Sequence, residues 1–438
     1  MGDLVDPLAD ARVARAHHLG WTAQGAERVG SFLTGIGDIE KGSLGINGVT
    51  QAKVEEVDSR RNRRCHLTLV SAAREINRLG SGRRSFALYH GLLYPLPQDP
   101  RVQQQKGSSV VSALICITTD LGDAFLAQDV DLIAELAISH SPKILTTKSL
   151  TWQAGKRELP ISLEVPRGLL QQPVVLTVRS LRPQSPVKDS LCLVPLVVSG
   201  WSTPISAQLP AEKLIERRFN LGHSPEPQKS DLCISEETGN SIARHIWDAA
   251  LASVIYLQQT ISGASEGMPP LRHLLQHPRQ SPLQVVELGA GCGIVGIALA
   301  QLHPYCSVLL TDLPEVEEIV TRNTNAARPA SKSTVSYRPL DWNEPLPEDL
   351  CSSAIDLILL SDCTYNADSL PALVSTLDRL IRISPGAIIL VALKRRHDSE
   401  TVFFDLMQSA AFRPLQDHIP LPSQHDQVDQ IELYCYSR

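Results

Sequence analysis

The sequence lacks a long apolar segment, a paired-cysteine motif and a basic amino-terminal stretch. No apolar run reaches the roughly 18 residues that a membrane-spanning helix needs. Asp3, Asp6 and Asp10 stand where a signal peptide would need basic residues followed by an apolar stretch. We therefore expect a protein of the cytoplasm, or of the nucleus as well, that does not contact a membrane.

Cysteine is present but unpaired in pattern. The nine cysteines are odd in number and widely scattered, and none forms a C-x-x-C pair. Such a pair is the usual anchor of a zinc site or a redox motif, so we expect no bound metal ion. An intracellular location favours reduced thiols in the core over a disulfide framework.

Strong charge of one sign is also missing. The formal net charge is −6 at pH 7, which gives no global attraction to nucleic acid or to anionic lipid. We expect no specific nucleic-acid partner, and we expect the protein to act as a monomer. Hydrophobic residues make up 43% and aromatic residues 5% of the 438 residues, an ordinary globular composition with room for several domains.

The texture of the sequence divides the chain into four parts. Residues 1–105 show no sustained helical or strand period, so we expect a poorly structured or irregular segment. Residues 106–215 contain short β-branched runs interrupted by proline and glycine, which predicts a small β-rich module. Polar residues and two prolines indicate a connector over 216–237. Residues 238–438 alternate strand, turn and helix, which predicts an α/β domain with a Rossmann-like doubly wound sheet.

Ligands of doubly wound sheets bind at the carboxyl ends of the strands, so these ends are where we expect the site. The predicted elements of the last part follow from apolar runs, helical periodicity and turn residues. Its strands are expected at 283–288, 307–311, 335–340, 355–360, 387–393 and 430–436, and its helices at 294–302, 314–327, 370–383 and 401–410.

The strongest motif is V-V-E-L-G-A-G-C-G-I-V-G, from Val285 to Gly296. It predicts a buried strand that passes through a glycine turn into a helix. Glycine lets the backbone turn sharply and approach a ligand closely, and the free amides of the helix start favour an anionic group. Gly291, Gly293 and Gly296 also fit the G-x-G-x-x-G spacing, so glycines alone leave both NAD and S-adenosylmethionine open.

Three further features favour S-adenosylmethionine. Glu287 lies at the strand end, where a carboxylate would repel a pyrophosphate but attract a cationic amino-acid group. Asp312 ends the next strand, where it can accept ribose hydroxyls in either cofactor. Asp341 and Trp342 follow the third strand and place a carboxylate and an indole where an adenine would lie.

On these motifs the chain resembles the seven-stranded, class I S-adenosylmethionine-dependent methyltransferases. Within them it is similar to the family-16 protein-lysine methyltransferases related to the METTL21 group. The resemblance covers about 238–438, and nothing upstream of about Ile144 resembles the family's short amino-terminal hairpin. The matching segments are Ile246-Trp247-Asp248-Ala249-Ala250, Glu287 to Gly296, Thr311-Asp312, Asn323 with Asn325, Leu340-Asp341-Trp342 and Leu360-Ser361-Asp362-Cys363-Thr364-Tyr365.

The resemblance implies a set of contacts with S-adenosylmethionine. Trp247 would pack against the methionine end, and Ser361 would lie beside the methyl donor. Asp312 would hold the ribose, and Trp342 would flank the adenine. The full set of expected cofactor-binding residues is Trp247, Glu287, Gly289, Ala290, Gly291, Gly293, Asp312, Leu313, Asp341, Trp342 and Ser361.

The resemblance also points to two catalytic residues, Asp362 and Tyr365, which match the family's Asp-x-x-Tyr motif. A carboxylate and an aromatic face can hold an ammonium group, and a tight apolar channel lowers a lysine pKa from about 10.4. We expect Asp362 to orient the amine and Tyr365 to shape the channel, with no dedicated general base. The alternative is that both residues cap the following helix.

The function expected is therefore methylation of a lysine side chain in a protein substrate. A small-molecule N-methyltransferase stays open, because cofactor motifs do not identify the acceptor. A nicotinamide-dependent oxidoreductase would use the same glycine turn, and a non-catalytic binding module would recruit a partner through the β-rich part. Arg395 and Arg396 either form a solvated face or steer an acidic protein substrate.

Overall fold

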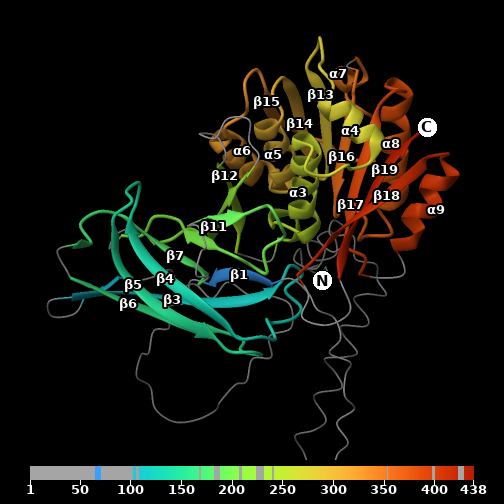
Figure 1. The fold of residues 1–438 in the computed structure, drawn as a ribbon. Coiled ribbons are helices and arrows are strands. Elements are labelled where there is room, and N and C mark those ends of the chain that lie inside the picture. The colour runs from blue at the N-terminus through green and yellow to red at the C-terminus, as the bar shows by residue number, and fades with distance from the viewer. Residues whose placement is uncertain are drawn as a thin grey trace, which may run out of the picture. The chain divides into compact units, whose positions relative to one another are not determined.

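The protein is described by a computed structural model. The structure describes residues 108–166, 169–181, 188–206, 210–222, 231–238, 241–352, 354–396, 400–422 and 429–438, together with the backbone of 65–70 and 102–104. Within these residues the strands form three sheets, and the helices accompany the last of them (Figure 1).

The carboxy-terminal sheet has the order β15-β14-β13-β16-β17-β19-β18. Only β19 runs against the others, since it pairs antiparallel with both β17 and β18. The chain moves outward from β13 to β15 and then returns to β16, which creates a topological switch point beside β13. The doubly wound sheet expected from the sequence is confirmed. Its strands are β13 (Leu283–Leu288), β14 (Cys306–Asp312), β15 (Thr334–Pro339), β16 (Leu357–Ser361), β17 (Ile388–Leu393), β18 (Arg413–Pro420) and β19 (Gln430–Ser437).

Helices cover both faces of this sheet. Val285 packs into one apolar core with α3 and α5, whereas Val286 packs into a second core with α8 and α9. Successive strand residues point to opposite faces, so continuous apolar runs such as β13 fit this two-sided burial. The helical elements are η3 (Ile242–Arg244), α3 (Asp248–Ser262), α4 (Pro269–Gln276), α5 (Ile294–Leu302), η4 (Pro314–Val316), α6 (Glu317–Ala326), α7 (Glu348–Ser352), α8 (Leu370–Ile383) and α9 (Thr401–Ser409).

The β-rich part contains the other two sheets, ordered β2-β3-β1-β9 with β6 on β3, and β12-β11-β10-β7-β4-β5 with β8 on β11. Strand β3 buries every second residue, and Ile115 of β3 shares an apolar core with Leu132 of β4. The strands are β1 (Cys65–Val70), β2 (Val102–Gln104), β3 (Ser108–Thr119), β4 (Val130–Ile138), β5 (Ile144–Trp152), β6 (Leu159–Pro166), β7 (Val174–Ser180), β8 (Asp189–Ser190), β9 (Val197–Val198), β10 (Gly200–Ser202), β11 (Leu214–Asn220) and β12 (Asp231–Glu237).

Two expectations about the front of the chain need correction. Strand β1 lies within the segment 1–105 that was expected to be irregular, and it pairs with β3 over its whole length. The rest of that segment, apart from β2, lies outside the described residues. The interval expected to be a connector, 216–237, holds most of β11 and all of β12. Both strands bury every second residue. The polar and charged residues at the alternate positions within each strand gave these stretches a polar composition.

Strands β11 and β12 also pack against the α/β part. Phe219 of β11 and Ile234 of β12 belong to the same apolar core as α3 and α5. Asn323 of α6 accepts the Ser235 amide at 2.8 Å and donates to the Ser235 carbonyl at 2.9 Å.

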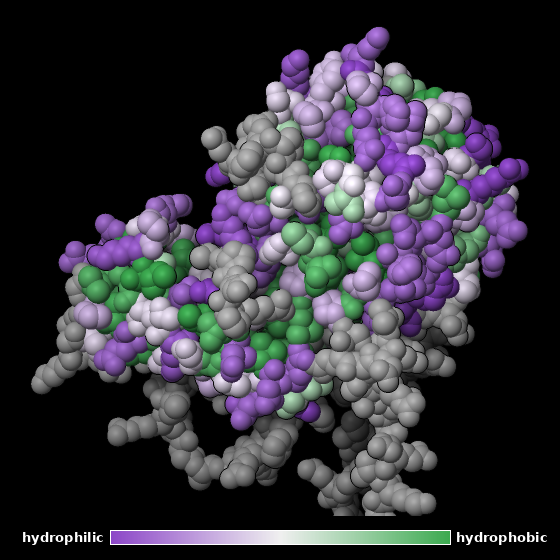
Figure 2. Space-filling view, in the orientation of Figure 1, coloured by the Kyte–Doolittle hydropathy of each residue, from purple (hydrophilic) through white to green (hydrophobic). Residues whose placement is uncertain are grey.

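On the face seen in Figure 2, hydrophilic side chains cover much of the α/β part, and apolar side chains gather over and beside the β-rich strands. Among the described helices, none has the length and apolar character that a bilayer crossing requires.

Candidate functional site

The glycine turn after β13 stands at the switch point of the carboxy-terminal sheet. Left-handed backbone occurs at Gly289 (φ +67°), Gly291 (φ +55°) and Gly293 (φ +79°). Residues with a Cβ atom rarely adopt this backbone conformation, which explains the run of glycines. The turn is anchored to β14, because the Ala290 amide donates to the Thr311 carbonyl at 3.0 Å. The Gly293 amide donates back to the Ala290 carbonyl at 2.7 Å, which closes the turn directly before α5.

Neighbouring segments approach this turn as closely as glycine permits. A Cβ on Gly289 would lie 2.6 Å from Cys363 Sγ and 3.4 Å from Trp342 Cζ2. A Cβ on Gly291 would lie 2.9 Å from the carbonyl oxygen of Ala243 in η3. The loops after β15 and β16 and the segment before α3 therefore line the turn. We call this set of walls around Gly289 and Gly291 the cradle.

Asp312 ties the end of β14 to the cradle. Its Oδ2 accepts the Gly291 amide at 2.7 Å, and its Oδ1 accepts the Leu313 amide at 2.7 Å. Burial raises the pKa of Asp312 to about 6, although the two amides act in the opposite direction. The side chain is thus ionised at neutral pH and stands at the cradle, as a residue that accepts ribose hydroxyls should. Its contact with the ribose, and that of half-exposed Leu313 with the cofactor, stay predictions.

Glu287 occupies a different position from the one its sequence context suggested. Its side chain is buried under the turn, and Oε2 accepts the Gly296 amide of α5 at 2.7 Å. Burial raises the pKa of Glu287 to about 8, with Asp312 adding to the rise and the Gly296 amide opposing it. The carboxyl group is therefore largely protonated at neutral pH. A neutral carboxyl group exerts little attraction on a cationic amino-acid group, and contact of Glu287 with the cofactor stays a prediction.

The loop after β15 presents the indole of Trp342 to the cradle. Its main chain is held in place, because the Trp342 carbonyl accepts hydrogen bonds from Thr376 Oγ1 at 3.2 Å and Arg379 Nη2 at 3.0 Å. Asp341 Oδ1 accepts both the amide and the side-chain Nδ2 of Asn343 at 2.9 Å. This local turn orients the carboxylate of Asp341, and the expected adenine contacts of both residues remain predictions.

Ser361 at the end of β16 offers an independent test of whether a ligand fits here. Its Oγ is buried and has no hydrogen-bond partner within the described part of the chain. Its carbonyl accepts the thiol of Cys363, the residue that reaches Gly289. A buried hydroxyl without a partner is costly unless a ligand satisfies it. The Asp312 carboxylate, an indole and this hydroxyl fit the nucleoside and the charged amino-acid end of S-adenosylmethionine.

Asp362 follows Ser361 and has a left-handed backbone (φ +56°), which Asp adopts more readily than most residues. Arg396 donates to both carboxylate oxygens, from Nη1 to Oδ1 and from Nη2 to Oδ2, at 2.8 Å each. Burial raises the pKa of Asp362 above its ordinary value, and Arg396 opposes this rise. An incoming amine would therefore share Asp362 with Arg396, and the orienting role of Asp362 stays a prediction.

Arg396 does not belong to the solvated face that was one of two expectations for it, and a role in steering an acidic substrate stays a prediction. Its side chain is only 14% exposed. Arg395, in contrast, is 37% exposed and pairs with Glu432 at 2.7 Å. Consecutive residues after β17 point in opposite directions, which explains why adjacent arginines differ so much.

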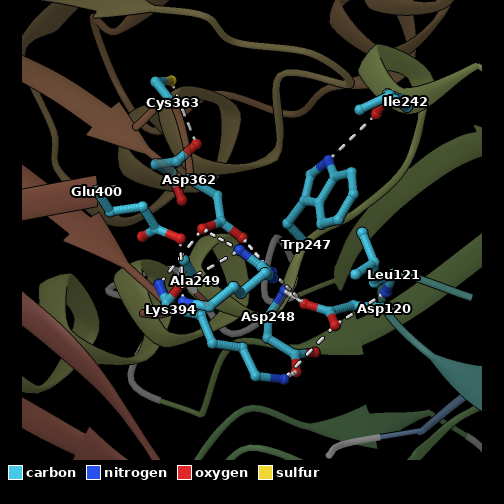
Figure 3. A network of polar contacts seen from close by, with 12 residues as sticks. Asp120, Leu121, Ile242, Trp247, Asp248, Ala249, Asp362, Cys363, Lys394 and Glu400 are labelled. Carbon is cyan, nitrogen blue, oxygen red and sulfur yellow. Dashed lines mark hydrogen bonds and ion pairs between the residues drawn. The ribbon is translucent and has the colours of Figure 1, made fainter. Parts of the chain in front are cut away.

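Three further charged residues, Asp120, Asp248 and Lys394, join Asp362 and Arg396. Sequence reasoning gave none of these three a role, and Figure 3 shows them with Asp362. Lys394 Nζ lies 2.8 Å from Asp248 Oδ2 and 3.5 Å from Asp120 Oδ1. Asp120 Oδ2 in turn lies 2.8 Å from Arg396 Nη2. We call Asp120, Asp248, Asp362, Lys394 and Arg396 the ion cluster. Lys394 directly follows β17 and could have been noticed as a strand-end residue, whereas no local motif marks Asp120.

Trp247 and Tyr365 complete the surroundings of the ion cluster. The Trp247 ring lies under the Arg396 guanidinium at 5.3 Å, and its Nε1 donates to the Ile242 carbonyl at 3.2 Å. Tyr365 is 60% exposed beyond the end of β16. The alternative that Asp362 and Tyr365 cap the next helix is wrong, because α8 begins at Leu370 with Ser369 as its N-cap. Their proposed catalytic roles stay predictions.

Comparison with known proteins points the same way as the geometry. A family model described as "Lysine methyltransferase" matches residues 226–410. The chain is 33% identical to Protein N-lysine methyltransferase METTL21A of Xenopus tropicalis over 38% of this chain and 67% of the relative. It is 30% identical to EEF1A lysine methyltransferase 3 of Mus musculus over 47% of this chain and 77% of the relative.

The match to a further relative extends beyond the α/β part of this chain. A UPF0665 family protein of Schizosaccharomyces pombe is 27% identical over 310 residues, which are 69% of this chain and 89% of the relative. A match of that length must include residues of the β-rich part. Among solved structures, a precorrin-6y C5,15-methyltransferase of Geobacter metallireducens covers 39% of this chain and 88% of its own, with 14% identity and a TM-score of 0.29.

Proposed function

Because the chain belongs to the lysine methyltransferase family, we propose that it transfers the methyl group of S-adenosylmethionine to a lysine side chain of a protein. The observation that carries this proposal is that Ser361 and Asp362 flank the cradle. Cys363, which follows them, reaches the position of a Gly289 side chain. The cofactor and the acceptor would therefore meet at the end of β16. A nicotinamide-dependent oxidoreductase and a non-catalytic module find no support in these relatives.

The chain's own residues would bind and orient rather than react. S-adenosylmethionine supplies a methyl group already activated by its positively charged sulfur. Asp312 would accept the ribose hydroxyls, Trp342 would flank the adenine, and the amides of the glycine turn would face the amino-acid end. Ser361 Oγ would gain the hydrogen bond that it lacks within the described residues. Such positioning can supply much of the rate enhancement of a direct displacement.

The acceptor amine must lose its proton to solvent before it attacks the methyl group, and two features around Asp362 act on the amine pKa in opposite directions. Removing an ammonium group from water lowers its pKa, while a nearby carboxylate holds it in place before the proton leaves. Asp362 is buried, and Tyr365 extends from the same loop toward solvent. Asp362 would orient the nitrogen toward the methyl group, and Tyr365 would shape the entrance.

The acceptor protein is the finer part of the proposal. Two of the relatives are named protein N-lysine methyltransferase METTL21A and EEF1A lysine methyltransferase 3. EEF1A is therefore the first protein to offer as a substrate. We further propose that the protein acts as a monomer in the cytoplasm or nucleus, without nucleic acid or membrane as a partner. The net charge of −6 supports the last two points.

The proposal is tested by transfer of radiolabelled methyl groups. The purified full chain is incubated with labelled S-adenosylmethionine and with lysate from cells that lack this protein. The proteins of the mixture are then separated. A discrete labelled protein whose label maps to lysine is expected. Label found only among small molecules would favour a small-molecule N-methyltransferase instead. A folded chain that fails to bind S-adenosylhomocysteine in calorimetry would remove the methyltransferase proposal altogether.

The role of Asp362 is tested with Asp362→Asn, which keeps the size of the side chain and tolerates the left-handed backbone. We expect kcat to fall roughly 100-fold, a typical loss when one electrostatic contact to the reacting groups is removed. S-adenosylhomocysteine affinity should change less than about twofold. The matched control is Asp368→Asn in the same loop, because Asp368 is exposed. Unchanged kcat in Asp362→Asn would refute the role.

A further inference from the structure

The turn after β3 sends one carboxylate from the β-rich part into the α/β part. The turn is closed by the Gly122 amide, which donates to the Thr119 carbonyl at 3.0 Å, and by Thr119 Oγ1, which donates to Asp123 at 2.7 Å. Leu121 is 46% exposed, whereas the Asp120 side chain is only 1% exposed. The turn therefore directs Asp120 inward, where Figure 3 shows it beside Asp248.

Asp120 is held almost entirely by groups of the α/β part. Oδ2 lies 2.8 Å from Arg396 Nη2 and 3.4 Å from the Asp248 amide at the start of α3. Oδ1 lies 3.5 Å from Lys394 Nζ and accepts its neighbour's amide, that of Leu121, at 3.0 Å. A buried carboxylate is costly unless cations and amides compensate it. Here two cations and the start of a helix do so.

Arg396 connects Asp120 to the residue proposed to receive the amine. Its Nη2 lies 2.8 Å from Asp120 Oδ2 and 2.8 Å from Asp362 Oδ2. The guanidinium is planar and its donors have fixed directions, so two carboxylates hold it in one orientation over Trp247. If Asp120 were uncharged, the Arg396 guanidinium would depend more on Asp362 and would compete more strongly with an incoming amine.

Lys394 provides a second connection. Burial alone would lower the pKa of Lys394, but the carboxylates of Asp248 and Asp120 raise it above its ordinary value. The Lys394 amide also donates to Asp362 Oδ1 at 3.3 Å. Lys394 thus stays charged and fixes the start of α3 relative to the end of β17.

We propose that Asp120 is a positioning residue of the methyltransferase site, acting on Asp362 through Arg396 and Lys394. The β-rich part would then contribute to catalysis rather than only precede the enzyme. The inference rests on the proposed function, because it assumes that Asp362 receives the lysine. The other ion-cluster members stand at strand and helix ends: Asp362 follows β16, Lys394 and Arg396 follow β17, and Asp248 starts α3 next to Trp247.

The test compares Asp120→Asn with the wild-type full chain. We expect kcat on the labelled protein substrate to fall at least tenfold, while the Kd of S-adenosylhomocysteine changes less than about twofold. Asp120→Glu, which restores the charge, should recover part of kcat. The matched control is Asp131→Asn in β4, because Asp131 is exposed and accepts a hydrogen bond from the neutral hydroxyl of Thr151 at 3.0 Å. It should leave kcat and KM unchanged.

A double-mutant cycle separates positioning from simple structural support. If Asp120 acts through Arg396, Asp120→Asn should have little further effect on kcat in the Arg396→Gln background. Fully additive losses, or loss of cofactor binding together with thermal stability, would show that the ion cluster only holds the fold. Normal kcat in Asp120→Asn would overturn this inference alone. Absence of methyl transfer by the wild-type chain would overturn the proposed function and, with it, this inference.

Discussion

Two buried carboxyl groups near the cradle differ in the pH at which they ionise. Asp312 has its pKa raised to about 6 and Glu287 to about 8, in both cases mainly by burial. Asp312 accepts the Gly291 amide of the glycine turn, whereas Glu287 accepts the Gly296 amide of α5. At neutral pH the first is largely charged and the second largely neutral. The ionised group that can accept ribose hydroxyls is therefore Asp312.

We predict that S-adenosylhomocysteine binding weakens as the pH falls below about 6. The folded state holds the Asp312 proton more tightly than the unfolded state, whose carboxyl has its ordinary pKa near 4. This group therefore stabilises the ligand-free protein as the pH falls from about 6 to 4, while the ionised form needed by the ribose disappears. Affinity should drop by up to tenfold per pH unit in calorimetry.

Two variants identify the group responsible. Asp312→Asn should bind at least tenfold more weakly at neutral pH, since it loses charge-assisted hydrogen bonds, and its affinity should no longer change near pH 6. Glu287→Gln should keep the change near pH 6, because Glu287 titrates near 8. A pH dependence near 6 that survives in Asp312→Asn would assign it to another group.

At the residue level, the sequence predicts the residues around the cradle better than those of the ion cluster. Gly289, Asp312 and Trp342 lie where the motif order placed them, because each follows a strand that could be recognised locally. Asp120 and Arg396 meet across 276 residues of chain. Their contact depends on how β3 packs against the α/β part, and no periodicity or spacing in a single sequence encodes that packing.

The element that shapes the cradle is the glycine turn between β13 and α5. Its glycines serve two purposes: they allow left-handed backbone, and they leave room for loops that come close. Gly289 needs both, since its φ is +67° and a Cβ would lie 2.6 Å from Cys363 Sγ. Gly155 in the β-rich part needs only the first, because its φ is +74° and no described atom lies within 4 Å of a Cβ there.

This contrast predicts different outcomes for two identical substitutions. Gly155→Ala should cost about 1–2 kcal/mol of stability from backbone strain and leave S-adenosylhomocysteine affinity unchanged. Gly289→Ala adds the clash with Cys363 to the same strain, so it should also weaken binding at least tenfold. Thermal unfolding and calorimetry measure the two effects. Equal ligand affinity in the two variants would contradict the assignment of Gly289 to the cradle.

At the scale of helices and strands, the local sequence pattern was sufficient to predict an element where apolar residues and flanking turn residues mark it clearly. Helices α5 and α8 have the predicted bounds. In α8 the apolar residues repeat with helical spacing, whereas α5 is an almost continuous apolar run that begins directly after the glycine turn. Strands β12 and β18 were missed. β18 is an edge strand with mostly exposed residues, and β12 buries only every second residue, one of which is the acidic Glu236, so neither carries an apolar run.

At the scale of the whole molecule, the methyltransferase part does not end where its motifs do. Its core with α3 and α5 includes Phe219 of β11 and Leu232 of β12, which are fully buried. Asn323 of α6 binds both the Ser235 main chain and the Cys292 carbonyl in the glycine turn. Strands of the β-rich part thus stabilise both this core and the glycine turn of the cradle.

We therefore predict that residues 238–438 alone do not form a stable cofactor-binding domain. Removing β11 and β12 would expose the apolar surface of α3 and α5, which favours aggregation. In the full chain, Phe219→Ala should lower stability by about 3–5 kcal/mol and reduce the melting temperature of the ligand-bound protein. Leu193→Ala, at a position 74% exposed, is the control and should change neither. A monodisperse fragment of 238–438 that binds S-adenosylhomocysteine like the full chain would contradict the shared core.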